Sequence, residues 1–515
     1  MKRIATLSGA LFTVSLLSLG AAVAAAEPSA NPASTKTDEE VFDAWRAAGT
    51  SAGWRSRAGA GNWRFSAVKP ADETAQRVIR WAAFQPGIIV NLPAPATPFV
   101  LRLSSSGITD AGLKELAGLK HVQILYLNGT KVTDAGLKHL AGLDGLQELV
   151  LTQTQVSGAG LKELAGLKNL QDLDLSRTQI TGVGLRHLAG LNNLRELNLG
   201  NTLTTDAGLK ELAGFKSLQN LVLRDTQITG AGLKHLAGLN SLQALTLSNT
   251  QVSDSGFKDL AGLKNLKDLR LEHTQITDAG LKYLAGLNNL QLLVLGHTQV
   301  TGEGLKHLAG LSNLQELFLY NTQVTDAGFK HLASLKSLQD LQLTNTPVEG
   351  VGLRQLAVLK SLRTLELNGT SLTDAGLKEL AALKSLQELG LANVLTISDE
   401  GIKQLAGLKN LQTVRLGGQG VTDAWLSALA GLVSLRDLTL WHANVTDAGL
   451  KELAGLRNLQ YLDLTSTPVT DAGLKELAGF KNLQMLDLMD TSATQPAVKE
   501  LRKLRPNLKI MYAPR

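Results

Sequence analysis

The chain has 515 residues, a formal net charge of +6 and no cysteine. The missing cysteines exclude disulfide bonds, thiolate metal sites and lipid attachment at a cysteine. After the N-terminal residues, no segment is apolar over the length that a bilayer crossing needs, so we expect no further membrane span.

The N-terminus has the pattern of an export signal, which we place at residues 1–26. Lys2 and Arg3 give a basic start, Leu11 to Leu19 is a short apolar core, and a run of small residues ends at Ala26. This order is typical of a secretory signal, although an uncleaved N-terminal anchor is the alternative. We therefore expect an exported protein, located in the periplasm, the cell envelope or outside the cell.

Two segments precede the main body of the chain. Residues 27–38 are rich in Pro, Ser and Thr, which predicts a flexible linker. Residues 39–97 hold four of the six tryptophans and are predicted to cap the first structural repeat, although a separate binding domain is the alternative. Inside this region we expect an amphipathic helix over residues 39–48 and a strand over residues 88–90.

One phrase recurs almost every 24 residues through residues 98–490. A clean copy begins at Leu146 and continues through Leu149 and Leu151 to Thr154. Repetition at this period indicates a solenoid of stacked units. Each unit is predicted to hold a short strand with its leucines inward, a threonine turn and a helix. Residues 491–515 are predicted to add a last helix and strand as a C-terminal cap.

The second half of each repeat predicts the helix. Ser157, or an acid such as Asp134, is expected to start it by accepting free backbone N–H groups. Gly166 is expected to end it in the left-handed conformation. The recurring Gly160 predicts close packing of the helix against the neighbouring turn.

These phrases resemble the leucine-rich repeat. The strand half reads Leu146-x-x-Leu149-x-Leu151-x-x-Thr154-x-Val156, with Thr where the family usually has Asn or Cys. The helix half, Val132-Thr-Asp-Ala-Gly-Leu-Lys-His-Leu-Ala141, is similar to the cysteine-containing, ribonuclease-inhibitor-like subclass, as in F-box receptors and bacterial relatives. The resemblance implies an α/β fold, a right-handed solenoid with a curved parallel sheet inside and helices outside. It also implies protein binding on the concave face.

Acidic side chains dominate the strand positions that flank the inward leucines. They are Glu148, Asp172, Asp174, Glu196, Asp268, Glu272, Glu316, Asp340, Glu366, Glu388, Asp437, Asp463 and Asp487. Only Arg224, Arg270 and Arg415 oppose them. Nucleic acid is not expected on such a face, because phosphates need cations. A basic protein or polycation is favoured instead, and the alternative is that the acids only keep an exposed sheet soluble.

Five aromatic residues occupy strand positions that should face solvent. They are Tyr126, Phe318, Tyr320, Trp441 and Tyr461. Rigid exposed aromatics are typical of binding hot spots, so we expect partner contacts at two clusters, one of Phe318 with Tyr320 and one of Trp441 with Tyr461.

Two histidines, His273 and His297, stand at equivalent positions of adjacent repeats, with Arg270 nearby. Without a third clear ligand they make a poor zinc site. A polar ladder is favoured instead, through Asn249, His273, His297, Asn321 and Asn345. An enzyme that uses this region is a weaker alternative.

Residues 390–445 depart from the repeat. One residue is inserted near Val394, Trp425 replaces the recurrent glycine, and Gly417-Gly418 interrupts a strand. Either the repetition is relaxed here, or a kink forms a binding site beside Trp441.

The sequence as a whole predicts an exported, non-enzymatic protein-binding scaffold without a cofactor or metal. The alternatives are a structural protein of the envelope or matrix and an enzyme inhibitor. A ubiquitin-ligase-like receptor is weaker, since residues 39–97 lack an F-box pattern and export conflicts with that role. The predicted partner-binding residues are Tyr126, Asp172, Asp174, Arg270, His273, His297, Phe318, Tyr320, Trp441 and Tyr461. The oligomeric state is left open.

Overall fold

The structure, a computed structural model, describes residues 37–58, 62–66, 75–82 and 84–513. The predicted signal and residues 27–36 of the predicted linker lie outside these ranges. The chain divides into two compact units, Met1–Leu218 and Gln219–Arg515.

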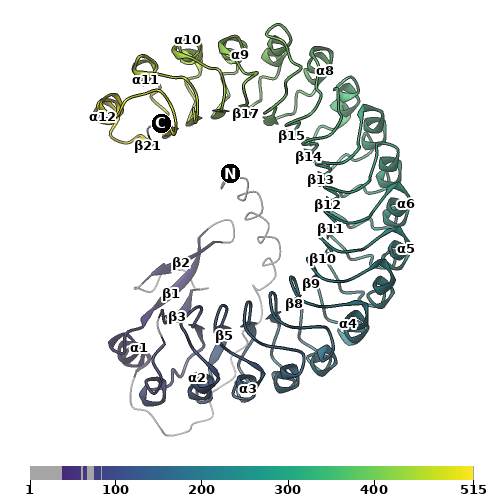
Figure 1. The fold of residues 1–515 in the computed structure, drawn as a ribbon, viewed down its shortest axis with the longest axis vertical. Coiled ribbons are helices and arrows are strands. Elements are labelled where there is room, and N and C mark those ends of the chain that lie inside the picture. Colours follow the sequence, from purple (N-terminus) through teal and green to yellow (C-terminus); the bar gives the residue numbers. More distant parts are fainter. Residues whose placement is uncertain (1–36, 59–61, 67–74, 83, 514–515) are drawn as a thin grey trace. The chain divides into compact units, whose positions relative to one another are not determined.

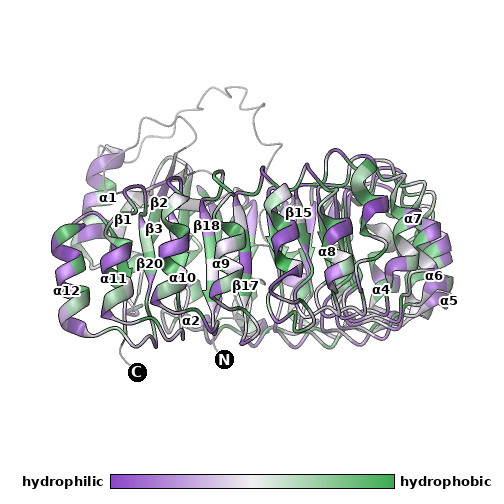
Figure 2. Ribbon diagram, turned by 90° about the horizontal axis from the view of Figure 1, so that it is seen from above, coloured by the Kyte–Doolittle hydropathy of each residue, from purple (hydrophilic) through white to green (hydrophobic). Residues whose placement is uncertain are grey.

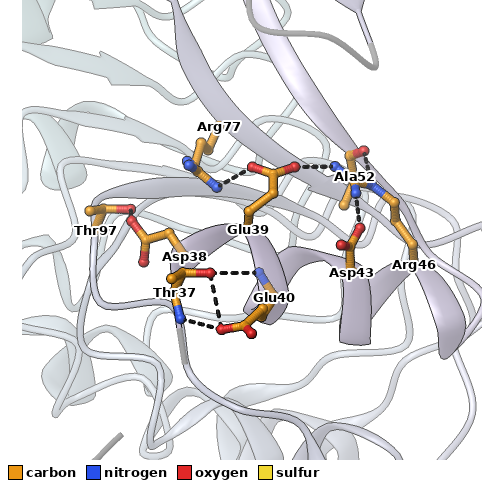
Figure 3. Close-up of polar contacts among 9 residues, drawn as sticks. All are labelled: Thr37, Asp38, Glu39, Glu40, Asp43, Arg46, Ala52, Arg77 and Thr97. Atoms are coloured by element: carbon orange, nitrogen blue, oxygen red, sulfur yellow. Dashed lines mark hydrogen bonds and ion pairs between the residues drawn. The ribbon is translucent and has the colours of Figure 1, made fainter. Parts of the chain in front are cut away.

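The first described element of this unit is a helix, α1 (Asp38–Ala47), as predicted. Thr37 caps it by accepting from the Glu40 backbone N–H at 3.3 Å, and the Glu40 carboxylate accepts from the Thr37 N–H at 2.6 Å (Figure 3). This reciprocal arrangement is a capping box. Glu39 on the same helix forms ion pairs with Arg46 at 3.1 Å and Arg77 at 3.6 Å. The last two residues of the predicted linker therefore belong to the start of α1.

Three strands follow α1: β1 (Ser51–Ala58), β2 (Asn62–Ser66) and β3 (Gln76–Arg80). β1 pairs antiparallel with both of the others, and β3 pairs in parallel with β4 (Phe99–Arg102). The strand predicted at residues 88–90 is wrong: Ile89–Asn91 is a 3-10 turn, η2. Its conformation is set by Glu115, whose carboxylate accepts from the backbone N–H groups of Gly87 and Ile89. These donors are therefore not available to a sheet.

Trp45 and Trp81 belong to the core of this region. Trp45 is fully buried, donates its Nε1–H to the Pro93 carbonyl at 2.9 Å, and meets Trp81 edge to face at 6.1 Å. On the other side, the Arg77 guanidinium lies 4.6 Å from the Phe42 ring centre. These contacts fix α1 against the sheet, and β3 extends the sheet by one strand beyond the first repeat.

The repeats of the first unit form a parallel sheet in chain order from β4 onward. The further strands are β5 (Val122–Tyr126), β6 (Glu148–Val150), β7 (Asp172–Asp174) and β8 (Glu196–Asn198). The connecting helices are α2 (Asp110–Leu113), η3 (Lys114–Leu116), α3 (Asp134–Leu137), η4 (Gly160–Leu164), η5 (Leu185–Leu188), α4 (Asp206–Lys210) and η6 (Glu211–Gly214).

The second unit continues the same pattern. Its parallel strands are β9 (Asn220–Val222), β10 (Ala244–Thr246), β11 (Asp268–Arg270), β12 (Leu292–Val294), β13 (Glu316–Phe318), β14 (Asp340–Gln342), β15 (Thr364–Glu366), β16 (Glu388–Gly390), β17 (Thr413–Gly417), β18 (Asp437–Trp441), β19 (Tyr461–Asp463), β20 (Met485–Asp487) and β21 (Lys509–Met511). The α-helices are α5 (Asp254–Phe257), α6 (Asp278–Leu281), α7 (Phe329–Leu332), α8 (Asp374–Leu380), α9 (Asp423–Leu429), α10 (Asp447–Glu452), α11 (Asp471–Leu477) and α12 (Gln495–Leu504). The 3-10 helices are η7 (Gly230–His235), η8 (Lys258–Leu260), η9 (Lys282–Leu284), η10 (Gly304–Leu308), η11 (Asp326–Gly328), η12 (Leu353–Val358), η13 (Gly401–Gly407) and η14 (Leu453–Gly455).

Within each unit the strands line the inner side of a curve and the helices lie outside (Figure 1), which confirms the predicted solenoid. The outer helices α8, α11 and α12 carry hydrophilic bands beside hydrophobic ones (Figure 2). No helix in the described ranges is long and apolar enough to span a membrane.

Most repeats are held by an aliphatic core and a threonine turn. Leu149, Leu151 and Val156 are fully buried, as are the helix leucines Leu161 and Leu164. The turn threonine Thr154 is also buried and donates its hydroxyl to the Leu151 carbonyl at 2.7 Å. Burial of such side chains supplies about 1.5–3 kcal/mol each, so stacking dominates the stability of the repeats.

A carboxylate latch joins neighbouring repeats. Asp134 accepts from both the backbone N–H of Ser157, at 2.7 Å, and its hydroxyl, at 2.5 Å. The prediction that Asp134 caps its own helix is therefore wrong, and Thr133 does so by accepting from the Ala135 N–H at 3.2 Å. A Cβ on Gly160 would lie 2.4 Å from an Asp134 carboxylate oxygen, so the recurrent glycine makes room for this latch, as the predicted close packing requires.

In the repeats, the residue with left-handed backbone lies directly before the turn threonine. Gly166, at the helix end, does not have this conformation, so the prediction of a left-handed helix end there is wrong. The helix ends instead by a tightened turn, in which the Leu167 N–H donates to the Leu164 carbonyl at 3.0 Å. The positive-φ position includes Gln153, Arg177, Asn201, Asp225, Asn249, His273, His297, Asn321 and Asn345. Asn, Asp and His tolerate this conformation better than most residues, which gives the two histidines a backbone role.

Candidate functional site

The inner face of the first unit begins with two arginines around Tyr126. The Arg102 guanidinium lies 4.3 Å from the centre of the Tyr126 ring, and Arg55 of β1 donates to the Tyr126 hydroxyl at 3.2 Å. Burial raises the pKa of this hydroxyl. The predicted count of three cations on the acidic face is therefore too low. Arg102 was visible in Leu101-Arg-Leu103, but Arg55 lies outside the repeats and had no sequence signal.

Acids follow Tyr126 along the same face. Asp174 accepts from the Ser176 backbone N–H at 2.8 Å and from the Asn198 amide at 3.2 Å, so its carboxylate is already hydrogen-bonded. Asp172 is different. Burial, together with the charges of Glu196 and Glu148, raises its pKa from 3.8 to about 7. Like-charged neighbours and desolvation both disfavour its ionised form.

The three cations that the sequence predicted are each held by an acid. Arg224 pairs with Asp225 at 3.5 Å, Arg270 with Asp268 at 2.8 Å, and Arg415 with Glu366 at 2.7 Å and Glu388 at 2.9 Å. Arg270 and Asp268 are only 8% and 9% exposed, so little of the Arg270 side chain reaches solvent.

Two further acids of the second unit form no ion pair in the described part of the chain. Glu316 of β13 and Asp340 of β14 lie in register on neighbouring strands. Burial raises the pKa of both, and the pKa of Asp340 rises from 3.8 to about 7, although the Gln342 amide donates to Asp340 at 2.7 Å. Both shifts disfavour the ionised forms of these carboxyl groups.

The two histidines form a polar ladder with Asn321 and Asn345, as predicted, whereas the Asn249 amide donates to Asp225 at 2.6 Å. The histidine rings stack at 3.9 Å, Asn321 contacts the His297 Nε2 at 3.1 Å, and Asn345 donates to Asn321 at 3.1 Å. Burial and the neighbouring His273 lower the pKa of His297. Among the residues placed by the structure, no group of three or more His, Cys, Asp or Glu side chains could hold a metal ion.

Phe318 and Tyr320, two residues apart in β13 and the turn after it, are both partly exposed on the inner face. The Tyr320 ring lies over Gly296 of the preceding repeat and 5.6 Å from the His297 ring, edge to face. Burial, with the charge of Glu272, raises the pKa of Tyr320 to about 12.

The second predicted aromatic cluster is wrong. Tyr461 is in register with Asp437 at the start of β18, whereas Trp441 ends that strand, in register with Gly417. Four residues of extended chain separate the two positions by about 13 Å. Trp441 instead covers Gly417 and lies 5.5 Å from the His442 ring.

Changes in core packing accommodate most of the irregular segment, residues 390–445. Trp425 is 1% exposed, and Val394 and Ala443 are buried where other repeats carry the threonine. The inserted residue leaves Leu395 exposed, and Gln419, which follows the positive-φ Gly418 in the threonine position, is exposed too. β17 and β18 are five residues long, so pairing continues through the segment. A binding site shaped by a kink stays a prediction.

The inner strands, the short outer helices and the buried leucine repeat define an α/β repeat solenoid. Residues 229–511, more than half of the chain, match the family "Leucine-rich repeat region". Residues 168–211 match "Leucine Rich repeats (2 copies)", and residues 100–117 match "Leucine Rich repeat". The chain therefore belongs to the leucine-rich repeat family.

Solved structures share this fold. A leucine-rich repeat protein of Leptospira interrogans is 24% identical, with 83% of this chain and 98% of that chain covered and a TM-score of 0.54. The TLR13–ssRNA13 complex matches at 20% identity over 81% of this chain and 70% of that chain, with a TM-score of 0.50. An internalin of Listeria monocytogenes is 23% identical over 69% and 88% of the two chains, with a TM-score of 0.46. No curated protein matches the chain.

Proposed function

We propose that the protein is an exported, non-enzymatic scaffold that binds another protein through the inner strand faces of its repeats. The observation that carries the proposal is the inner face of the second unit, where Phe318, Tyr320 and Trp441 are partly exposed among acids. Aromatic area of this kind is typical of interface hot spots. Leucine-rich repeat solenoids commonly bind partners on such concave surfaces.

The partner is a basic protein. Burial and repulsion between acids raise the pKa of both Asp172 and Asp340 to about 7. A nearby cation of the partner would lower the free energy of their ionised forms. Arg224, Arg270 and Arg415 pair with other acids of the same chain, and Glu316 and Asp340 form no ion pair in the described residues. This leaves Glu316 and Asp340 for a partner. Complementary charge also favours correct orientation and fast association.

The proposal also includes export of the protein and its membership of a subclass of leucine-rich repeats. Residues 1–26 support export, and the phrase Val132–Ala141 supports the cysteine-containing, ribonuclease-inhibitor-like subclass. The turn threonine, as at Thr154, takes the place of that subclass's usual Asn or Cys and makes the carbonyl hydrogen bond there. No cofactor is required for binding of this type.

The test is affinity capture from the exported fraction of the producing cells, with partners quantified by mass spectrometry. The bait is the full chain, compared with E316Q/D340N/E388Q on the inner face and E303Q/E349Q on exposed positions outside the strands. We expect basic proteins to be captured by the wild type and the control, to be lost with the inner-face variant, and to dissociate in high salt. Equal capture by all three baits would overturn the proposal in favour of a structural role.

A further inference from the structure

Two consecutive glycines, Gly417 and Gly418, end β17 on the inner face of the second unit. The Trp441 ring lies against the first of them. A Cβ added to Gly417 would be 2.7, 2.9 and 3.0 Å from the ring atoms Cε2, Nε1 and Cδ2. Because these distances are nearly equal, a face of the indole, rather than an edge, covers the glycine. Trp441 is partly exposed, so the opposite face of the ring is turned towards solvent.

Two polar side chains stand beside this ring. The Asn393 amide lies over the second glycine, with its oxygen 2.6 Å from a Cβ added to Gly418. The His442 ring is 5.5 Å from the Trp441 ring and nearly perpendicular to it, at 83°. Backbone hydrogen bonds place Asn393 one strand before Gly418 and His442 one strand after it. Their backbones are therefore about 10 Å apart, twice the spacing of strands, and the indole face lies between them.

The polar groups around the ring are available to a ligand. In the described part of the chain, the Asn393 amide, the ring nitrogens of His442 and the Trp441 Nε1–H have no hydrogen-bond partner. Asn393 and His442 are both exposed, so these groups are reached from solvent. The arrangement is an aromatic floor between an amide and an imidazole.

This place differs in charge from the acidic stretches of the inner face. Its floor and sides contain no acid, lysine or arginine. Arg415, on the same strand as the glycines, is held by Glu366 at 2.7 Å and Glu388 at 2.9 Å. Asp463 is on β19, whereas the Trp441 ring lies towards β17. A neutral ligand with several hydroxyl groups is therefore favoured over an ion.

We propose that Trp441, Asn393 and His442 form a binding site for a neutral sugar ring of an oligosaccharide. One face of a pyranose carries C–H groups of partial positive charge, which the negative face of an indole attracts. The sugar hydroxyls both donate and accept, as do an amide and an imidazole, which matches the two sides of the site. The inference goes beyond the proposed function, because it assigns a second class of ligand to the inner face and does not depend on a protein partner.

The test is isothermal titration calorimetry of the full chain with two neutral hexasaccharides, cellohexaose and chitohexaose, and with the anionic hexagalacturonate. We expect binding of at least one neutral probe, weakened about tenfold or more in W441L, which keeps apolar area but removes the ring. N393G/H442G should weaken it as much, because glycine keeps the positive φ of both positions but removes their polar groups. The matched control N249G/N345G makes the same exchange at two other positive-φ positions, and should stay within about twofold of the wild type.

Circular dichroism monitors the folding of each variant. Absence of binding of both neutral probes at about 1 mM would overturn the inference, as would equal affinities of N393G/H442G and N249G/N345G. Tighter binding of hexagalacturonate than of either neutral probe would refute a neutral ligand. If W441L loses protein capture but keeps sugar binding, Trp441 belongs to the protein interface alone, and the sugar site is wrong while the proposed function stands.

Discussion

The ring of Tyr320 lies directly over Gly296, the residue at the equivalent position of the preceding repeat. A Cβ on Gly296 would lie 2.2 Å from the ring atom Cε2. Trp441 has the same relationship to Gly417, where the nearest ring atom would be 2.7 Å from an added Cβ. In both places a glycine provides the space in which an aromatic side chain lies against the sheet.

Replacing Gly296 by Ala should therefore displace the Tyr320 ring. Overpacking of this kind typically costs about 1–3 kcal/mol, which urea unfolding would detect. The control is G262A, where the nearest atom to an added Cβ is 3.9 Å away. If the two substitutions had equal effects, the close contact between Tyr320 and Gly296 would be refuted.

The carboxylate latches should contribute to stacking of the repeats. Asp278 accepts from the Thr301 N–H at 2.8 Å and from its hydroxyl at 2.6 Å. D278A leaves these donors without their acceptor, and a loss of roughly 1–3 kcal/mol in the free energy of unfolding is expected. D144A, at an exposed turn, serves as the control and should change stability by less than about 0.5 kcal/mol. A loss of stability in D278A no larger than that in D144A would count against the latch.

Arg415 should stabilise the inner face by neutralising Glu366. The Glu366 side chain is 8% exposed and its carboxylate receives the Arg415 guanidinium at 2.7 Å. Removing the cation in R415A leaves a buried acid without its charge partner, a type of change that costs several kcal/mol when burial is complete. The exposed ion pair of Arg354 with Glu379, at 3.7 Å, provides the control R354A. Chemical denaturation should show a clearly larger loss for R415A, and similar losses would contradict this role.

The pH dependence of stability should include a contribution from Asp340. Its pKa is about 7 in the folded chain against 3.8 as the ordinary value, so the folded state binds more protons between these values. Asp340 therefore stabilises the fold fully below about pH 4, and this contribution is lost as the pH rises through 7. D340N should raise stability at pH 8 by roughly 1–3 kcal/mol, less than the full pKa difference represents, because water screens a partly exposed group. It should have little effect at pH 4, and a gain confined to acid pH would contradict the assignment.

The repeat period alone predicted the solenoid, because leucines such as Leu149 and Leu151 have one way to be buried together. The predictions that concern single residues were less accurate where two repeats meet. Asp134 looks like a cap within its own repeat, and only stacking brings Ser157 of the next repeat to its carboxylate. The strand expected at residues 88–90 is replaced by η2, because a distant acid, Glu115, takes the backbone donors.

The sequence predicted which residues lie on the candidate site, but not which of them contact one another. Alternation identified the inward and outward positions, so the placement of Phe318 and Tyr320 on one face followed from the sequence. The separation of Trp441 from Tyr461 follows from register, because Tyr461 pairs with Asp437 and Trp441 pairs with Gly417. Both pairs keep the repeat period, so the error lay in comparing neighbouring strands without comparing positions along them. Arg55 reaches Tyr126 from a strand outside the repeats, so no periodic signal predicted it.

The most direct test of the account is the affinity of the captured partner for inner-face variants, measured by isothermal titration calorimetry on folded proteins. The variant F318A/Y320A/W441A removes the aromatic area of the inner face. The control V351A/V433A removes exposed apolar side chains outside the strands, each 57% exposed. We predict a loss of affinity of at least about a hundredfold for the first variant and less than about threefold for the second. Unchanged affinity of the aromatic variant would contradict binding through the inner face.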